Sequence, residues 1–133
     1  DTAYTFRNGW HHTGDIGRFD SDGYLFIVDR LKDMIITGGE NVYSLEVEDA
    51  LYTHPDVQEC AVVGSPHMEW GEIVTAAIIP KPGKIIDETE IRDFLKSKIS
   101  AYKVPKRVYT VEDFPRSPAG KILKRVMREG YRI

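Results

Sequence analysis

The chain has 133 residues, of which 41% are apolar and 29% are charged, and its net charge is −3. A chain of this length can bury one modest core or two small lobes, which excludes a large enzyme with a deep pocket of its own. It holds no long apolar stretch or signal-like segment, so we expect no membrane span. Because it begins with Asp1, we expect it to be part of a longer protein.

Charge is unevenly distributed along the sequence. From Ala101 onward nine lysines and arginines face three acids, a net +6, so the first hundred residues carry −9. A basic end on an acidic body points to an anionic partner such as a nucleotide, a phosphate or a nucleic acid. A solvated basic surface is an equally frequent explanation.

The first predicted element is a β-hairpin over residues 17–30. Two runs with aromatic and β-branched residues flank Ser21-Asp22-Gly23, and Asp-Gly suits a tight turn. The next apolar run ends in Gly38-Gly39, where the backbone is free to adopt positive φ. A helix is then expected, with Ser44 as its N-cap and Pro55 just beyond its end.

Further along, strands are expected over residues 57–64 and 72–80. A second helix opens with the capping box Asp87 and Glu90 and places apolar residues at helical spacing, namely Ile91, Phe94, Leu95 and Ile99. A short strand near residues 107–111 and a last helix from about Ile122 to near Gly130 complete the chain. Because the elements do not alternate regularly, the predicted fold class is α+β: a small β-sheet covered by helices on one side and preceded by the β-hairpin.

Cys60 is the only cysteine and lies in an apolar run. A single cysteine forms no internal disulfide, which favours a reducing, cytoplasmic location, and a buried structural thiol is favoured over a nucleophile. His11 and His12 are adjacent and lack the spacing of metal ligands, so no metal site is predicted.

The segment PRSPAGKILKR places Lys121 after a Pro-Ala-Gly sequence and ahead of a basic helix. A phosphate-binding loop would need glycine where Pro115 stands and serine or threonine where Ile122 stands, so this segment is not one. Lys121 could deliver an ammonium group into an active site, although most loop lysines are simply solvated.

Two further side chains could bind a nucleotide. Asp15 lies on a tight loop, where it could cap a turn or accept both hydroxyls of a ribose. Arg30 ends a strand and could reach the same ribose or a phosphate, or pair with Asp29 or Asp33. Gly38-Gly39 could be an ordinary turn or a place where a ligand passes close to the backbone.

These motifs occur in a fixed order: TGD, then DRLKDMIITGGEN, then PRSPAGK. With them the chain resembles, over nearly its whole length, the C-terminal end of adenylate-forming enzymes, the superfamily of acyl-CoA synthetases, peptide-synthetase adenylation domains and luciferases. The segments GGENVY and EVEDAL are more similar to the acyl-CoA synthetase branch. Ser44 stands where many relatives have proline, and we expect it to cap its helix nonetheless.

The resemblance implies an ATP-dependent carboxylic (fatty) acid–CoA ligase. In such enzymes a carboxylate attacks the α-phosphate of ATP to give an acyl-adenylate and pyrophosphate, and coenzyme A then displaces AMP to form the thioester. Asp15 and Arg30 would contact the ribose, and Lys121 would be the catalytic lysine that bridges the substrate carboxylate and the nucleotide. Lys121 is also implied as a site of regulatory acetylation.

The resemblance further implies that the C-terminal domain rotates about Lys32 between the two steps. Residues 1–31 would then be the end of a large N-terminal adenylation domain, and residues 32–133 the mobile lid. After rotation Gly38, Gly39 and Glu40 would line the coenzyme A channel, while Lys121 would swing towards solvent.

The phosphate loop and the acyl pocket of such enzymes belong to the N-terminal domain, which this sequence does not contain. We therefore expect this chain to be inactive alone and Mg²⁺ to be bound only in the full-length enzyme. The expected partners are its own N-terminal domain, a carboxylic acid, ATP and coenzyme A, and no nucleic acid. Two alternatives remain open: a nucleic-acid-binding domain that uses the basic end, and a non-catalytic interaction module that keeps the family pattern as a scaffold.

Overall fold

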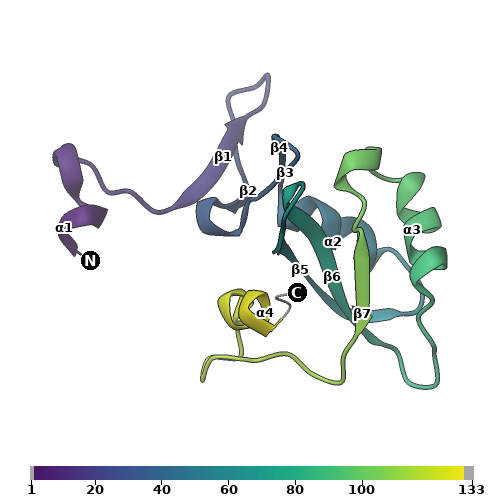
Figure 1. Cartoon of the computed structure of the whole chain (residues 1–133). Helices are drawn as coiled ribbons and strands as arrows, with labels where there is room; N and C mark the ends of the chain where they lie inside the picture. Colours follow the sequence, from purple (N-terminus) through teal and green to yellow (C-terminus); the bar gives the residue numbers. More distant parts are fainter. Residues whose placement is uncertain (1, 131–133) are drawn as a thin grey trace.

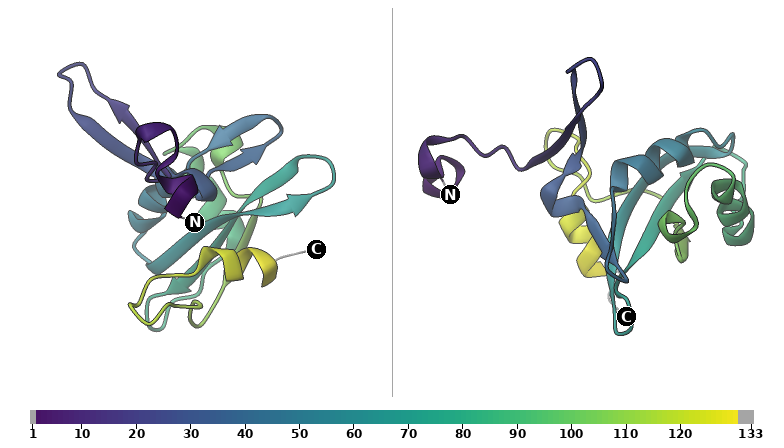
Figure 2. Two further views of the ribbon diagram at one scale, coloured as in Figure 1. Left: turned by 90° about the vertical axis from the view of Figure 1, so that its left-hand side faces the viewer. Right: turned by 90° about the horizontal axis from the view of Figure 1, so that it is seen from above.

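A projecting β-hairpin and a small helix-covered sheet make up the chain, whose computed structural model describes residues 2–130 (Figure 1). The hairpin consists of β1 (Asp15–Phe19) and β2 (Leu25–Arg30) and follows the short helix α1 (Thr2–Thr5) and a 3₁₀ turn, Arg7–Gly9. Both views of Figure 2 show it extending away from the sheet. The predicted hairpin is confirmed. Within residues 2–130 no helix combines the length and the apolar composition that crossing a bilayer requires.

The sheet is organised around its central strand, β6 (Gly71–Pro80). On one edge β6 pairs antiparallel with β5 (Val57–His67) along its whole length. The other edge is shared: β3 (Ile35–Thr37) reaches it at Gly71, and β7 (Arg107–Thr110) runs parallel to it from Thr75 to Ile78. The last strand, β4 (Glu40–Val42), pairs with β3. All three strands predicted here are present, and β5 extends three residues beyond its predicted end.

Helices cover both faces of this sheet. On one face α2 (Ser44–Tyr52) and α3 (Glu88–Lys96) bury Leu51 and Leu95 against Val62 and its neighbours. On the other face α4 (Lys124–Gly130) contributes Met127, which packs in a second cluster with Phe114. The α+β class is confirmed, whereas the expectation of helices on one side only was wrong. An uninterrupted apolar run such as that in β5 is typical of a strand covered on both faces.

Helix termini follow the predictions in part. The Asp87 carboxylate accepts the backbone N–H groups of Thr89 and Glu90 at 2.8 and 3.2 Å, so it caps α3 as expected. The Glu90 side chain does not complete the capping box, because its Oε1 lies 3.8 Å from His54 Nε2. The last helix begins at Lys124 rather than Ile122 because Ile122 forms a β-bridge with Arg116. Its end near Gly130 falls at the limit of the described residues.

Cys60 should be unreactive while the chain is folded. It is 2% exposed, and its thiol lies 3.7 Å from the Glu48 carbonyl oxygen. Burial, and then the charge of Glu48, raises the pKa of Cys60 from 9.0 to about 12. We therefore predict negligible reaction with dithionitrobenzoate at about pH 8 in buffer and one equivalent in urea. Rapid labelling of the native chain would contradict the packing of α2 on β5.

Candidate functional site

Asp15 and Arg30 face each other at the open end of the hairpin. They are register partners in β1 and β2, and Arg30 Nε lies 3.2 Å from Asp15 Oδ1. The Arg30 side chain is 52% exposed and the Asp15 side chain is 30% exposed. A pair so open to water adds little stability, and its remaining oxygen and nitrogens stay accessible to a ligand. The alternative ion pair of Arg30 with Asp29 or Asp33 is not formed.

Lys121 has a fixed backbone and an unpaired ammonium group. Its loop is closed by two bonds at 2.8 Å, from Ser117 N–H to the Lys121 carbonyl and from Gly120 N–H to the Ser117 carbonyl. Gly120 adopts a φ of +85°, which favours glycine. Arg116 ties the loop to β5 through an ion pair with Glu59 at 2.8 Å. Within residues 2–130 the exposed Lys121 ammonium has neither a hydrogen bond nor an ion pair.

A buried polar cluster joins β2 to α2 and α4. Asp29, 1% exposed, accepts the backbone N–H of Ser44 at 2.6 Å and its hydroxyl at 3.0–3.1 Å. The Lys124 ammonium donates to the Ser44 hydroxyl at 3.0 Å and lies 2.7 Å from a Glu48 carboxylate oxygen. The same Glu48 oxygen accepts the N–H of Val62 at 2.9 Å. We refer to Asp29, Ser44, Glu48 and Lys124 as the Ser44 cluster.

The predicted capping role of Ser44 was wrong. Tyr43 occupies the N-cap position without a side-chain bond, and Ser44 is the first residue of α2. The Ser44 hydroxyl donates to the Asp29 carboxylate. A hydrogen bond to an ionised carboxylate is stronger than the bond that an N-cap serine would accept from a neutral backbone N–H. Asp29 thus caps α2 from a different segment, and its negative charge suits a helix N-terminus.

The sequence carries a signal for this cluster. Ser44 and Glu48 share a helical face with the buried Val47 and Leu51, so two polar residues occupy core positions. Burial raises the pKa of Glu48 above its ordinary value of 4.5, Lys124 opposes that rise, and Asp29 adds to it. Buried polar side chains of this kind are costly unless paired, which marks them as candidates for a specific role.

The Gly38-Gly39 turn connects β3 to β4. Both glycines have positive φ, +56° and +84°, as a tight hairpin turn of the mirror-image type requires. Gly38 lies under the ring of Trp70, whose backbone carbonyl accepts the Gly38 N–H at 2.9 Å. The Lys106 ammonium lies 3.3 Å from the centre of the Trp70 ring. Glu40, the first residue of β4, is exposed.

Lys32 lies in the 3₁₀ turn Leu31–Asp33 that links the hairpin to the sheet. It is exposed, and its carbonyl accepts a hydrogen bond from Arg128 at 3.1 Å. A groove of about 630 Å³ separates this turn from α4. Arg30 and Lys32 line one side, and Ile122, the residue after Lys121, belongs to the other.

The structure therefore groups some predicted site residues and separates others. Asp15, Arg30 and Lys32 lie together on the hairpin and its link, and a groove leads from them to the Lys121 loop. Figure 1 places the β3–β4 turn and the loop before α4 at different ends of the sheet domain. The Gly38-Gly39 turn and the Lys121 loop are therefore separate candidate sites.

One group of side chains in the described residues has the proximity of a metal site: His54, Asp56 and Glu90, with ligand atoms within 4.8 Å of one another. His54 Nδ1 accepts the backbone N–H of Asp56 at 3.1 Å, so the proton of the neutral ring lies on Nε2. A metal-bound imidazole instead donates from its second nitrogen. This geometry does not fit a metal ligand, and Mg²⁺ prefers oxygen donors.

Comparison with known proteins identifies the family. The profile of the AMP-binding enzyme C-terminal domain matches residues 46–121. The chain belongs to this family. It is 47% identical to a feruloyl-CoA synthase of Amycolatopsis sp and 48% identical to the long-chain-fatty-acid–CoA ligase FadD13 of Mycobacterium tuberculosis, each over 130 residues. These matches cover 98% of the chain and 26% of each relative, so the chain spans about a quarter of their length.

Solved structures agree with this assignment. ATP-bound MatB from Rhodopseudomonas palustris is 43% identical and superposes with a TM-score of 0.90, whereas apo MatB gives 0.79 at 44% identity. Both matches cover 98% of this chain and 26% of MatB. The chain is thus more similar in shape to the ATP-bound structure of MatB than to the apo structure. The resemblance to adenylate-forming enzymes of the acyl-CoA synthetase branch is confirmed.

Substitution of the two turn glycines should separate backbone strain from crowding. Alanine at either position has an unfavourable positive φ, costing about 1–2 kcal/mol. At Gly38 its Cβ would also lie 2.7 Å from the Trp70 ring, whereas at Gly39 nothing lies within 4 Å. We expect Gly38→Ala to lower the free energy of unfolding by about 1–3 kcal/mol more than Gly39→Ala in urea titrations. Equal losses would show that Trp70 does not pack on Gly38.

Proposed function

We propose that this chain is the C-terminal lid of an AMP-forming carboxylic acid–CoA ligase. Residues 32–133 would be the lid, and residues 1–31 the end of the N-terminal adenylation domain. The family, the identity to two CoA ligases and the shape shared with ATP-bound MatB support this proposal. The observation that carries it is Lys121, whose backbone is fixed while its ammonium has no partner in the described chain.

In the first step two anions must meet, the substrate carboxylate and the α-phosphate of ATP. Asp15 would accept the ribose hydroxyls, and Arg30 would contact the same sugar, since the two side chains are already adjacent. The Lys121 ammonium would stabilise the negative charge that develops towards the departing pyrophosphate. A preorganised donor of this kind contributes on the order of 3 kcal/mol to lowering the barrier.

In the second step the coenzyme A thiol must reach the acyl-adenylate. Rotation about Lys32 would withdraw Lys121 and present the turn formed by Gly38, Gly39 and Glu40. Gly39 leaves open space beside the backbone, which suits the passage of a narrow pantetheine arm. Lys32 lies in a short turn between two elements, where hinge residues commonly occur.

ATP and coenzyme A enter this scheme as substrates, together with a carboxylic acid whose pocket belongs to the N-terminal domain. Mg²⁺ would accompany the ATP phosphates there, and we assign it no residue of this chain. The lone buried cysteine favours a cytoplasmic location for the parent enzyme.

The nucleic-acid alternative loses much of its basis in the fold. Of the eight basic residues between Ala101 and Gly130, the last residue that the structure describes, four form ion pairs within the chain, namely Lys103, Arg116, Lys124 and Arg128. Each of these four side chains would have to leave its carboxylate partner in order to bind a phosphate. A salt-sensitive gel shift with DNA or RNA would favour that alternative, and no shift at low salt is expected.

Removing the Lys121 ammonium should impair the two steps unequally. In the intact parent enzyme we predict that Lys121→Ala lowers ATP–pyrophosphate exchange about a hundredfold to a thousandfold, because the developing charge loses its donor. Thioester formation from a supplied acyl-adenylate should be largely unchanged. Acetylated Lys121 should behave like alanine, since acetylation removes the same charge.

The exposed Lys84, in the turn after β6, provides a matched control. Lys84→Ala should leave both half-reactions at their wild-type rates. Equal losses in the two half-reactions of Lys121→Ala, or wild-type exchange in that variant, would contradict the proposed role.

A further inference from the structure

The Ser44 cluster spans the position at which the lid is proposed to rotate. Asp29 precedes Lys32, whereas Ser44, Glu48 and Lys124 all follow it. Between the hairpin (residues 15–30) and residues 34–130 the hydrogen bonds of the structure all end on Asp29. A rotation about Lys32 moves one side relative to the other, so these bonds must break when the lid turns.

We propose that Asp29 and Ser44 form a latch that holds the lid in its adenylation orientation, and that both act as positioning residues for the first half-reaction. This inference rests on the proposed function. Asp29 adjoins Arg30, and Lys124 follows Lys121 by three residues. The latch therefore fixes the ribose-binding end of the hairpin relative to the loop that carries the catalytic lysine.

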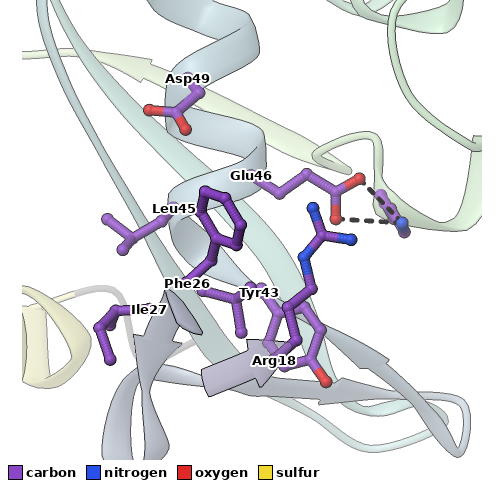
Figure 3. A pocket seen from close by; sticks show the side chains of 9 residues that line it. Arg18, Phe26, Ile27, Tyr43, Leu45, Glu46 and Asp49 are labelled. Atoms are coloured by element: carbon purple, nitrogen blue, oxygen red, sulfur yellow. Dashed lines mark hydrogen bonds and ion pairs between the residues drawn. The ribbon is translucent and has the colours of Figure 1, made fainter. Parts of the chain in front are cut away.

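Elsewhere between the hairpin and the lid the facing side chains are partly exposed to solvent. The buried contact between them is therefore the latch. A crevice of about 580 Å³ separates the hairpin from α2, lined by Phe26 and Ile27 on one side and Tyr43 and Leu45 on the other (Figure 3). Phe26 and Ile27 are 49% and 56% exposed, whereas Asp29 and Ser44 are 1% and 0% exposed. Glu46, which also lines the crevice, pairs with Lys103 at 2.9 Å, and because both residues follow Lys32 this ion pair does not cross the hinge.

The hydroxyl of Ser44 connects charges of opposite sign. It has one proton, which it gives to the Asp29 carboxylate while its oxygen accepts from Lys124. Asp29 also accepts the backbone N–H groups of Arg30 at 2.8 Å and Ser44 at 2.6 Å. Once separated, the carboxylate would be rehydrated, so the latch can open without leaving a buried unpaired charge.

Ser44→Pro is the sharpest variant, because it removes both the N–H and the hydroxyl that bind Asp29. Proline is favoured at the first position of a helix, and Tyr43 already has the extended φ and ψ of −87° and 119° that a residue before proline prefers. The helix should therefore persist. Ser44→Ala removes the hydroxyl alone. Ser97→Ala is the control, because Ser97 donates to the Phe94 carbonyl at the end of α3 and touches nothing across the hinge.

The first test compares the two half-reactions in the intact parent. Ser44→Pro should lower ATP–pyrophosphate exchange about tenfold or more, leave thioester formation from supplied acyl-adenylate unchanged or faster, and exceed the effect of Ser44→Ala. Ser97→Ala should match the wild type. A latch with only a structural role would lower both half-reactions together, and that result, or no change in either, would overturn the proposal.

The second test measures lid orientation without catalysis. Spin labels on Asp22→Cys in the hairpin turn and Lys84→Cys in the lid, both exposed positions, report the distance across the hinge in the intact parent with other exposed cysteines replaced. With ATP bound, one distance should dominate, and Ser44→Pro should add a second population. An unchanged distribution would overturn the latch. If the wild type exchanged pyrophosphate with no acid, the proposed ligase function would fail separately, whatever the labels show.

Discussion

A carboxylate from one segment satisfies the start of a helix in another, and the arrangement of the molecule depends on that bond. The first N–H groups of any helix lack partners within it, and the side chain at the N-cap of α2 supplies none. Asp29 fills this position from β2, fifteen residues earlier in the chain. The Ser44 hydroxyl also accepts a hydrogen bond from Lys124, and Lys124 forms an ion pair with Glu48. Hairpin, α2 and α4 thereby meet at one buried point.

If Asp15, Arg30 and Lys121 have the roles proposed for them, this junction holds them together although Arg30 and Lys121 are 91 positions apart in the sequence. The polar character of this junction also allows the hairpin to separate from α2 and α4. Polar contacts can be exchanged for water at modest net cost, whereas a continuous apolar interface would resist separation. Beside β2, Phe26 and Ile27 remain 49% and 56% exposed along an open crevice that faces α2.

Much of the fold could be predicted from local patterns, because periodicity and turn chemistry act over a few residues. The hairpin around Gly23, the Asp87 cap and three strands of the sheet, β5, β6 and β7, were expected on that basis, whereas the short strands β3 and β4 were not. Coverage of the second sheet face could not be predicted, since it depends on where α4 returns from a distant loop. Asp15 and Arg30 were expected to converge on one ligand, and strand register brings them together.

The Ser44 cluster escaped prediction for the same reason. Its members are scattered over the sequence, and each has an ordinary local role that competes with the long-range one. Ser44 matches the pattern of an N-cap, and Asp29 matches that of a surface ion pair with Arg30. Only the three-dimensional structure shows that a buried carboxylate offers the serine a stronger partner than its own helix does.

The backbone amide of Ser44 offers the most direct test of this account, because no carbonyl within α2 can accept it and its protection depends on Asp29. Hydrogen exchange at that amide should be measured in the intact parent, first with ATP and then with coenzyme A and an unreactive acyl-adenylate analogue. We expect protection with ATP and marked loss of protection with coenzyme A and the analogue. Equal protection in both states would mean that the Asp29–Ser44 contact persists through the cycle, and it would contradict the idea that this bond sets the orientation of the lid.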